Sequence, residues 1–189
     1  MNHSLKIFNK KSLLKTLLIL PFLTSPFLSQ INSTKALEFQ WDKNNGYKSL
    51  KYYQRNPRKN SKNKIFLFFR PSERKTGLLN IDIKIPQNFK STFKPKNISF
   101  CKAKIGGFSS KTKCLENIPS DVEIDNETKK VTIYPISPVP SSKDVYAVVF
   151  KIVNPQKAGL YQFHSFGKSS GAIPVSIYLG SWTLRVDQQ

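Results

Sequence analysis

The chain has 189 residues, of which 39% are hydrophobic and 12% aromatic, so it holds enough apolar material for the core of one domain and is not a disordered chain. Lys and Arg number 31 against 11 Asp and Glu, a formal net charge of +20, and an acidic partner therefore has to be considered. Two Cys and two His leave few residues for metal or redox chemistry.

The first residues have the outline of a signal peptide. Four lysines precede an apolar stretch that two prolines interrupt, and this stretch is shorter than the roughly 20 residues that a membrane span needs. An A-x-A-like site predicts cleavage between Ala36 and Leu37. We therefore expect a leader over residues 1–36, a single domain over residues 37–189 and no permanent membrane anchor.

The pattern of apolar residues after the leader is that of a many-stranded β fold. Apolar and polar residues alternate with a period of two, between breaks rich in Gly, Pro and Asn. About eight strands are expected, and the nine candidate segments are residues 39–41, 64–70, 81–85, 97–103, 122–124, 131–133, 146–152, 161–163 and 175–186. This number predicts an all-β, two-sheet sandwich that is immunoglobulin-like in general architecture.

Three segments of the expected sandwich carry finer predictions. Residues 64–70 are apolar on both faces, which predicts a central strand that is covered on both sides. Residues 137–142 are rich in Pro and Ser and predict a surface loop. In the last strand the apolar positions change from odd to even numbers around Gly180 and Ser181, and a β-bulge there would return both halves to the core.

The two cysteines are interpreted through the compartment that the leader predicts. In an oxidising compartment Cys101 and Cys114 form one disulfide, which stabilises the fold by roughly 3 kcal/mol in the chain-entropy model. Together with His164, the only His after the leader, they supply at most three N or S ligands. No metal and no cofactor is expected.

The positive charge is concentrated in the first half of the expected domain. Residues 37–113 contain 19 basic and four acidic residues, whereas residues 114–189 contain seven of each. A basic segment with two neighbouring aromatic residues is the candidate polyanion-binding site, and it comprises Tyr52, Tyr53, Arg55, Arg58, Lys59, Lys62 and Lys64. The alternative is a solvated surface without function, because 26 of the 31 basic residues are Lys, as an A+T-rich genome would produce.

Two further motifs have ordinary explanations. Carboxylates alternate along Asp121, Glu123, Asp125 and Glu127 and could bind calcium, but the apolar residues between them favour a half-buried strand with its polar face outward. His164 shares a strand face with Gln162, which favours exposure or a satisfied hydrogen bond over catalysis.

Several stretches, taken together, resemble the cyanobacterial family known as domain of unknown function 2808. The resemblance rests on Leu37-Glu38-Phe39, Trp41-Asp42, Leu67-Phe68-Phe69-Arg70-Pro71, Ile85-Pro86 with Phe89, Cys101 and Cys114, Asn154-Pro155, Gly159-Leu160-Tyr161-Gln162-Phe163, and Tyr178-Leu179-Gly180-Ser181-Trp182. It implies an exported protein of a photosynthetic bacterium, in the periplasm or cell envelope, with no assigned activity and no catalytic residues to carry over.

We expect an exported, non-enzymatic cell-envelope protein, periplasmic or secreted, that acts by binding or structural association. Its expected partner is an anionic envelope polymer, held by the basic segment, or an envelope protein; nucleic acid is not expected. One alternative is an exported hydrolase or metal-dependent enzyme that uses His164 with downstream carboxylates. Another is a module that binds a protein partner through an exposed sheet edge.

Overall fold

The structure, a computed structural model, describes residues 48–188. The expected leader, the cleavage site at Ala36 and Leu37, and the expected strand at residues 39–41 lie outside the described residues. The strands are β1 (Tyr52–Gln54), β2 (Lys62–Phe69), β3 (Leu78–Lys84), β4 (Ile98–Lys104), β5 (Lys113–Ile118), β6 (Ser120–Asp125), β7 (Lys130–Pro135), β8 (Tyr146–Val153), β9 (Gly159–Ser169) and β10 (Ser176–Val186). Two 3-10 helices, η2 (Pro71–Glu73) and η3 (Pro95–Asn97), interrupt them. Among residues 48–188 there is no helix long and apolar enough to cross a membrane.

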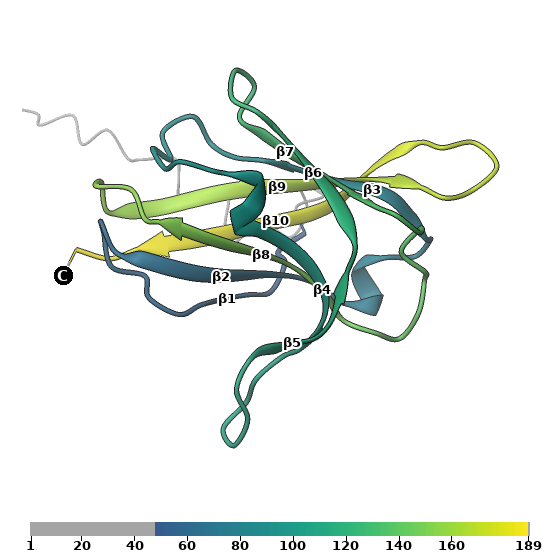
Figure 1. Ribbon diagram of the computed structural model, residues 1–189, viewed down its shortest axis with the longest axis horizontal. Coiled ribbons are helices and arrows are strands. Elements are labelled where there is room, and N and C mark those ends of the chain that lie inside the picture. The colour runs from purple at the N-terminus through teal and green to yellow at the C-terminus, as the bar shows by residue number, and fades with distance from the viewer. Residues whose placement is uncertain (1–47, 189) are drawn as a thin grey trace, which may run out of the picture. The chain divides into compact units, whose positions relative to one another are not determined.

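The strands form two five-stranded sheets, as the sequence predicted for a sandwich (Figure 1). The first sheet has the order β1-β2-β8-β4-β5 and the second β10-β9-β3-β7-β6, with antiparallel pairing throughout the recorded pairs. The described residues contain ten strands rather than about eight, because β1 and β5 escape the period-two pattern. β1 has only three residues, and a register shift between Lys102 and Ala103 disturbs the pairing of β5.

The core lies between the two sheets and is rich in aromatic rings. Trp182 of β10 is fully buried and meets Phe69 of β2 edge-on, with ring centroids 5.2 Å apart. Phe89, in the connection after β3, packs edge-on against Tyr161 and Phe163 of β9 at 4.9 and 5.0 Å. Edge-to-face contacts of this kind stabilise aromatic cores beyond the burial of area alone.

Strand β2 is buried on both faces, which confirms the prediction for residues 64–70. Its odd-numbered apolar residues enter the main core, whereas Phe66 and Phe68 join a second cluster with Ala147 and Val149 of β8. The disulfide between Cys101 and Cys114 is present, as predicted, and belongs to this second cluster. It links β4 to β5, and so it cross-links the hairpin that these two strands form.

The β-bulge in the last strand is confirmed. The register between β9 and β10 shifts between Tyr178 and Gly180, and Leu179 and Trp182 on either side are both buried. Gly180 adopts φ +137°, and a Cβ there would lie 2.6 Å from the carbonyl oxygen of Lys48. A residue without a side chain is therefore required at the bulge.

The segment at residues 137–142 is a loop, as predicted, but it is not wholly on the surface. Val139 is 2% exposed and exchanges two backbone hydrogen bonds with Leu78, at 2.8 and 2.9 Å. The short bridge pulls one apolar side chain of a Pro- and Ser-rich segment into the core, which the composition of the segment did not indicate.

Candidate functional site

Cations line up across the outer face of the first sheet, at one end of its strands. Lys64 of β2 lies directly opposite Lys151 of β8, and the backbone N–H of Arg55 donates to the carbonyl oxygen of Lys64 at 3.0 Å. Alternation along the strands sends Ile65 and Ile152 into the core and leaves the two lysines on the outer side. Like charges directly opposite each other destabilise a sheet, so strand pairing alone does not favour this arrangement.

Two buried asparagines hold the loop that carries Arg55 and Arg58. The side-chain amide of Asn154 donates to the carbonyl oxygens of Asn56 and Arg58, at 2.9 and 2.7 Å. Its carbonyl oxygen accepts a hydrogen bond from the side-chain amide of Asn63 at 3.0 Å, and Asn63 in turn accepts one from the backbone N–H of Asn56. Because both asparagine side chains are buried and paired, they fix the path of this loop.

Two adjoining grooves run over these residues. One has a volume of about 520 Å³ and the other about 700 Å³, and they share Lys62, Asn63 and Lys151. We call the combined surface the basic groove. Its cations are Arg55, Arg58, Lys62, Lys64, Lys94, Lys96 and Lys151, and no Asp or Glu lines it.

The cations of the basic groove have no recorded carboxylate partner within the described residues. The three ion pairs recorded between residues 48 and 188 join Arg70 to Glu73, Lys102 to Asp144, and Arg185 to Asp187. Uncompensated Lys and Arg at the rim of a concave surface attract anions and donate charge-assisted hydrogen bonds to phosphate, sulfate or carboxylate oxygens.

The structure separates the other residues of the predicted basic segment. Tyr53 is exposed, lies 6.1 Å from the ring of Phe66, and lines a third groove of about 350 Å³ that shares Arg55 and Lys64 with the basic groove. Tyr52 packs instead against the main core, and burial raises the pKa of its hydroxyl. Lys59 donates to the side chain of Gln188 at 2.9 Å, away from the groove lining.

Three groove cations were not part of the predicted segment. Lys94 and Lys96 flank or belong to η3, and Lys151 belongs to β8. The outward position of Lys151 follows from the alternation in β8, where it stands between the buried Phe150 and Ile152. Its place beside β2, and that of η3, depend on pairings between segments about 45 to 90 residues apart, which local sequence patterns do not specify.

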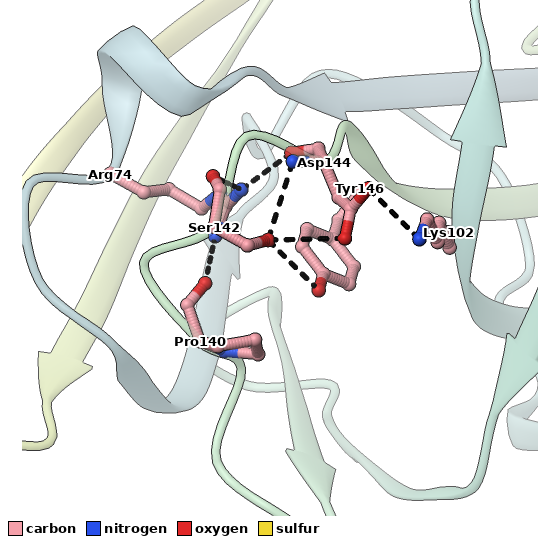
Figure 2. Close-up of polar contacts among 6 residues, drawn as sticks. All are labelled: Arg74, Lys102, Pro140, Ser142, Asp144 and Tyr146. Carbon is pink, nitrogen blue, oxygen red and sulfur yellow. Dashed lines mark hydrogen bonds and ion pairs between the residues drawn. The ribbon is translucent and has the colours of Figure 1, made fainter.

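A second polar cluster, around Arg74, supports a loop (Figure 2). The guanidinium group of Arg74 donates to the carbonyl oxygens of Pro140, Ser142 and Asp144 and lies 4.5 Å from the ring centre of Tyr146. Burial lowers the pKa of Arg74, while the neighbouring Tyr146 and Asp144 act in the opposite direction. Since both terminal nitrogens of the guanidinium group already donate to backbone carbonyls, this arginine holds the loop before β8 in place.

The edge of the same cluster carries an exposed ion pair. Lys102 lies 2.9 Å from Asp144, and this hydrogen bond raises the pKa of Lys102 and lowers that of Asp144. A small groove of about 240 Å³ beside it is lined by both signs of charge, including Glu116. The basic groove is therefore the stronger candidate for binding an anion.

His164, the residue of the alternative enzyme hypothesis, forms a hydrogen bond with the side chain of Ser181. Its Nδ1 lies 2.7 Å from the hydroxyl oxygen of Ser181, which in turn lies 2.6 Å from the hydroxyl oxygen of Tyr178. Ser181 is fully buried, so a substrate has no direct access to its hydroxyl group. Burial, followed by the positive charge of Lys84, lowers the pKa of His164. Within residues 48–188, no group of three or more His, Cys, Asp or Glu side chains is arranged to hold a metal ion.

Comparisons with known proteins give a family and several solved structures. Residues 39–186 match the model of the family described as Protein of unknown function (DUF2808). No curated protein matches the chain. Among solved structures, the chain is similar to the bacterial hydrophobin BslA, with 17% identity, a TM-score of 0.47, and coverage of 75% of this chain and 92% of that one.

Two solved collagen-binding domains are also similar to the chain. The collagen-binding domain from a Staphylococcus aureus adhesin has 11% identity and a TM-score of 0.40, and the match covers 71% of this chain and 93% of that one. The collagen-binding subdomain of the Enterococcus faecalis surface protein ACE has 6% identity and a TM-score of 0.40, and the match covers 74% of this chain and 97% of that one.

Proposed function

Because this chain belongs to the family described as Protein of unknown function (DUF2808), whose description names no activity, we propose its function from the basic groove. The protein is a non-enzymatic binding module that holds an anionic polymer of the cell envelope in this groove. The carboxylate, phosphate or sulfate groups of the polymer pair with the groove cations, and the sandwich serves as a rigid support.

The observation that carries this proposal is the charge of a preformed concave surface. Seven cations and no carboxylate line the basic groove, and buried hydrogen bonds of Asn63 and Asn154 fix the loop beneath two of them. Positions fixed before binding reduce the entropy lost when a polymer is bound. Five of the seven are Lys, which act as point charges and suit a repeated anionic group rather than bidentate reading of a base.

The envelope is the proposed location because two independent features favour export. The first 36 residues have a signal-peptide outline, and the Cys101–Cys114 disulfide is of the kind that persists in oxidising compartments. We propose cleavage after Ala36 and one mature domain from Leu37 to the end of the chain.

The test is a salt titration of binding by the purified protein with its disulfide intact. Inorganic polyphosphate and alginate serve as flexible phosphate and carboxylate polymers, and duplex DNA as a rigid comparison. The groove variant combines Lys62→Gln, Lys64→Gln and Lys151→Gln. The matched control combines Lys75→Gln, Lys143→Gln and Lys168→Gln, which removes the same charge from exposed positions outside the groove lining.

The groove variant should bind a flexible polymer more weakly and with a flatter salt dependence. Each lost phosphate contact reduces the slope of log K against log salt concentration by about 0.7. The control variant should keep the slope of the natural protein, and duplex DNA should bind weakly. Equal losses in the two variants would mean that the charge acts as a diffuse surface property, and the proposal would then be abandoned.

A further inference from the structure

The hairpin of β4 and β5 ends in an exposed tight turn. Figure 1 shows it projecting away from the two sheets, at the bottom of the view. The backbone N–H of Gly107 donates to the carbonyl oxygen of Ser110 at 2.9 Å, which makes Phe108 and Ser109 the two central residues of the turn. Phe108 therefore occupies the extreme tip of the hairpin.

Phe108 has no apolar surroundings in the described protein. Its relative exposure is 112%, against 39–77% for the other large apolar residues on the surface. A fully exposed benzyl group at the end of a projecting turn leaves a large apolar area in water, and no residue between 48 and 188 covers it.

The hairpin is built so that this ring stays at its tip. The disulfide joins Cys101 to Cys114 near the base, and Ile105 packs against the cluster of Phe66 and Phe68 on the outer face of the first sheet. At the neck, a Cβ on Gly106 would lie 2.6 Å from the backbone nitrogen of Thr112, so the two arms approach as closely as glycine permits. The cross-link and the close approach hold the tip in one arrangement before any partner binds.

Lysines surround the apolar tip. Lys104 and Lys113 lie opposite each other where the strands end, and Lys111 follows the turn; all three are exposed. The chain has eight Lys and no acidic residue between Asp82 and Glu116. An aromatic ring at the tip is thus accompanied by three positively charged side chains, Lys104, Lys111 and Lys113, which we call the collar lysines.

We propose that the β4–β5 hairpin tip docks on the surface of an anionic lipid bilayer. The ring of Phe108 enters the boundary between headgroups and acyl chains, where aromatic side chains are favoured, and the collar lysines contact lipid phosphates. Charge complementarity selects the lipid surface: a protein pocket that accepted Phe108 would not require three uncompensated lysines around the ring. This role depends on Phe108 and not on polymer binding in the basic groove, although Lys111 also lines the third groove beside Arg55 and Lys64.

The experiment is co-sedimentation of the purified protein with vesicles of phosphatidylcholine that contain phosphatidylglycerol, and with vesicles of phosphatidylcholine alone. The test variant is Phe108→Ser. The matched control is Ile136→Ser, which removes a large apolar side chain that is 75% exposed on a different loop. Phe108→Ser should weaken binding to anionic vesicles by about tenfold or more, because the variant has no ring to move from water into the bilayer. Ile136→Ser should bind as the natural protein does.

Two further variants test the two parts of the tip separately. In Phe108→Trp, anionic vesicles should shift the tryptophan fluorescence to shorter wavelength by more than in the natural protein, whose own Trp41 and Trp182 supply the background, because the added indole enters an apolar environment. Neutralising Lys104, Lys111 and Lys113 to Gln should weaken binding to anionic vesicles and reduce its salt dependence.

Specific results would overturn the proposal. They are equal sedimentation of Phe108→Ser and the natural protein, absence of a fluorescence shift in Phe108→Trp, or equal binding to vesicles with and without phosphatidylglycerol. Absence of vesicle binding by the natural protein would overturn it too and direct attention to a protein partner. Polyphosphate binding by Phe108→Ser should be unchanged, so failure of one proposal is distinguishable from failure of the other.

Discussion

Replacement of Asn154 by Ala should both destabilise the protein and weaken its binding of anions in the basic groove. The Asn154 side chain is 2% exposed and makes three hydrogen bonds, to the carbonyl oxygens of Asn56 and Arg58 and to the amide of Asn63. A hydrogen bond contributes about 0.5–1.5 kcal/mol net, and a buried polar group left without a partner costs about 1–3 kcal/mol. The amide of Asn63 would remain buried, whereas the two loop carbonyls belong to the half-buried Asn56 and the exposed Arg58.

These magnitudes give a loss of about 2–4 kcal/mol in the free energy of unfolding for Asn154→Ala. For a chain of this size the loss corresponds to a fall in Tm of about 5–15 °C. Urea titration and thermal melting measure both quantities. Because the same bonds hold the loop under Arg55 and Arg58, polyphosphate binding at low salt should weaken as well.

Two other variants make this reasoning refutable. Asn154→Asp keeps the shape but loses both donated bonds and buries a charge facing two carbonyl oxygens, so it should destabilise at least as strongly. Asn88→Ala, at an exposed position, should leave Tm and binding unchanged. If Asn154→Ala melts with the natural protein and binds polyphosphate equally well, then the buried asparagines do not position the groove.

Three further predictions concern the bulge, the loop arginine and the histidine. Gly180→Ala should lower the free energy of unfolding by about 2–4 kcal/mol in urea titrations, because the new methyl group meets a backbone oxygen at positive φ, whereas Gly107→Ala, where nothing lies within 4 Å, should be nearly neutral. Arg74→Lys should cost about 2–4 kcal/mol, since a single ammonium group cannot reach three carbonyl oxygens at once; an unchanged urea midpoint would contradict the role assigned to the guanidinium group. Burial lowers the pKa of His164 in the folded protein, so the unfolded chain takes up a proton first, and stability should fall as pH drops below about 6.5. His164→Gln should flatten this dependence in urea titrations at a series of pH values, and an unaltered profile would assign it to other groups.

The predictions that held depend on short-range alternation. The two-faced burial of β2 and the bulge near Gly180 both follow from which side of a strand each residue occupies. That side is dictated by the pleat of the strand and not by its neighbours. The strands that sequence reasoning missed, β1 and β5, are short or irregular and owe their conformation to pairing with β2 and β4.

The candidate site also has one part that the sequence alone indicated and another part that depended on strand pairing. Arg55, Arg58, Lys62 and Lys64 stand close together in the chain, so the sequence alone marked them as a positively charged segment. Sequence alone also distinguished the basic first half of the domain from its neutral second half. The match to the family model, which needs only the sequence, identified the family to which the chain belongs.

Only the tertiary structure decided which cations share one surface. Pairing of β2 with β8 brings Lys151 opposite Lys64, and the groove lining adds Lys94 and Lys96 from around η3, while Tyr52 turns into the core. The physical reason is that a strand's own residues determine which of them face outward, but long-range sheet pairing determines which outward faces become neighbours.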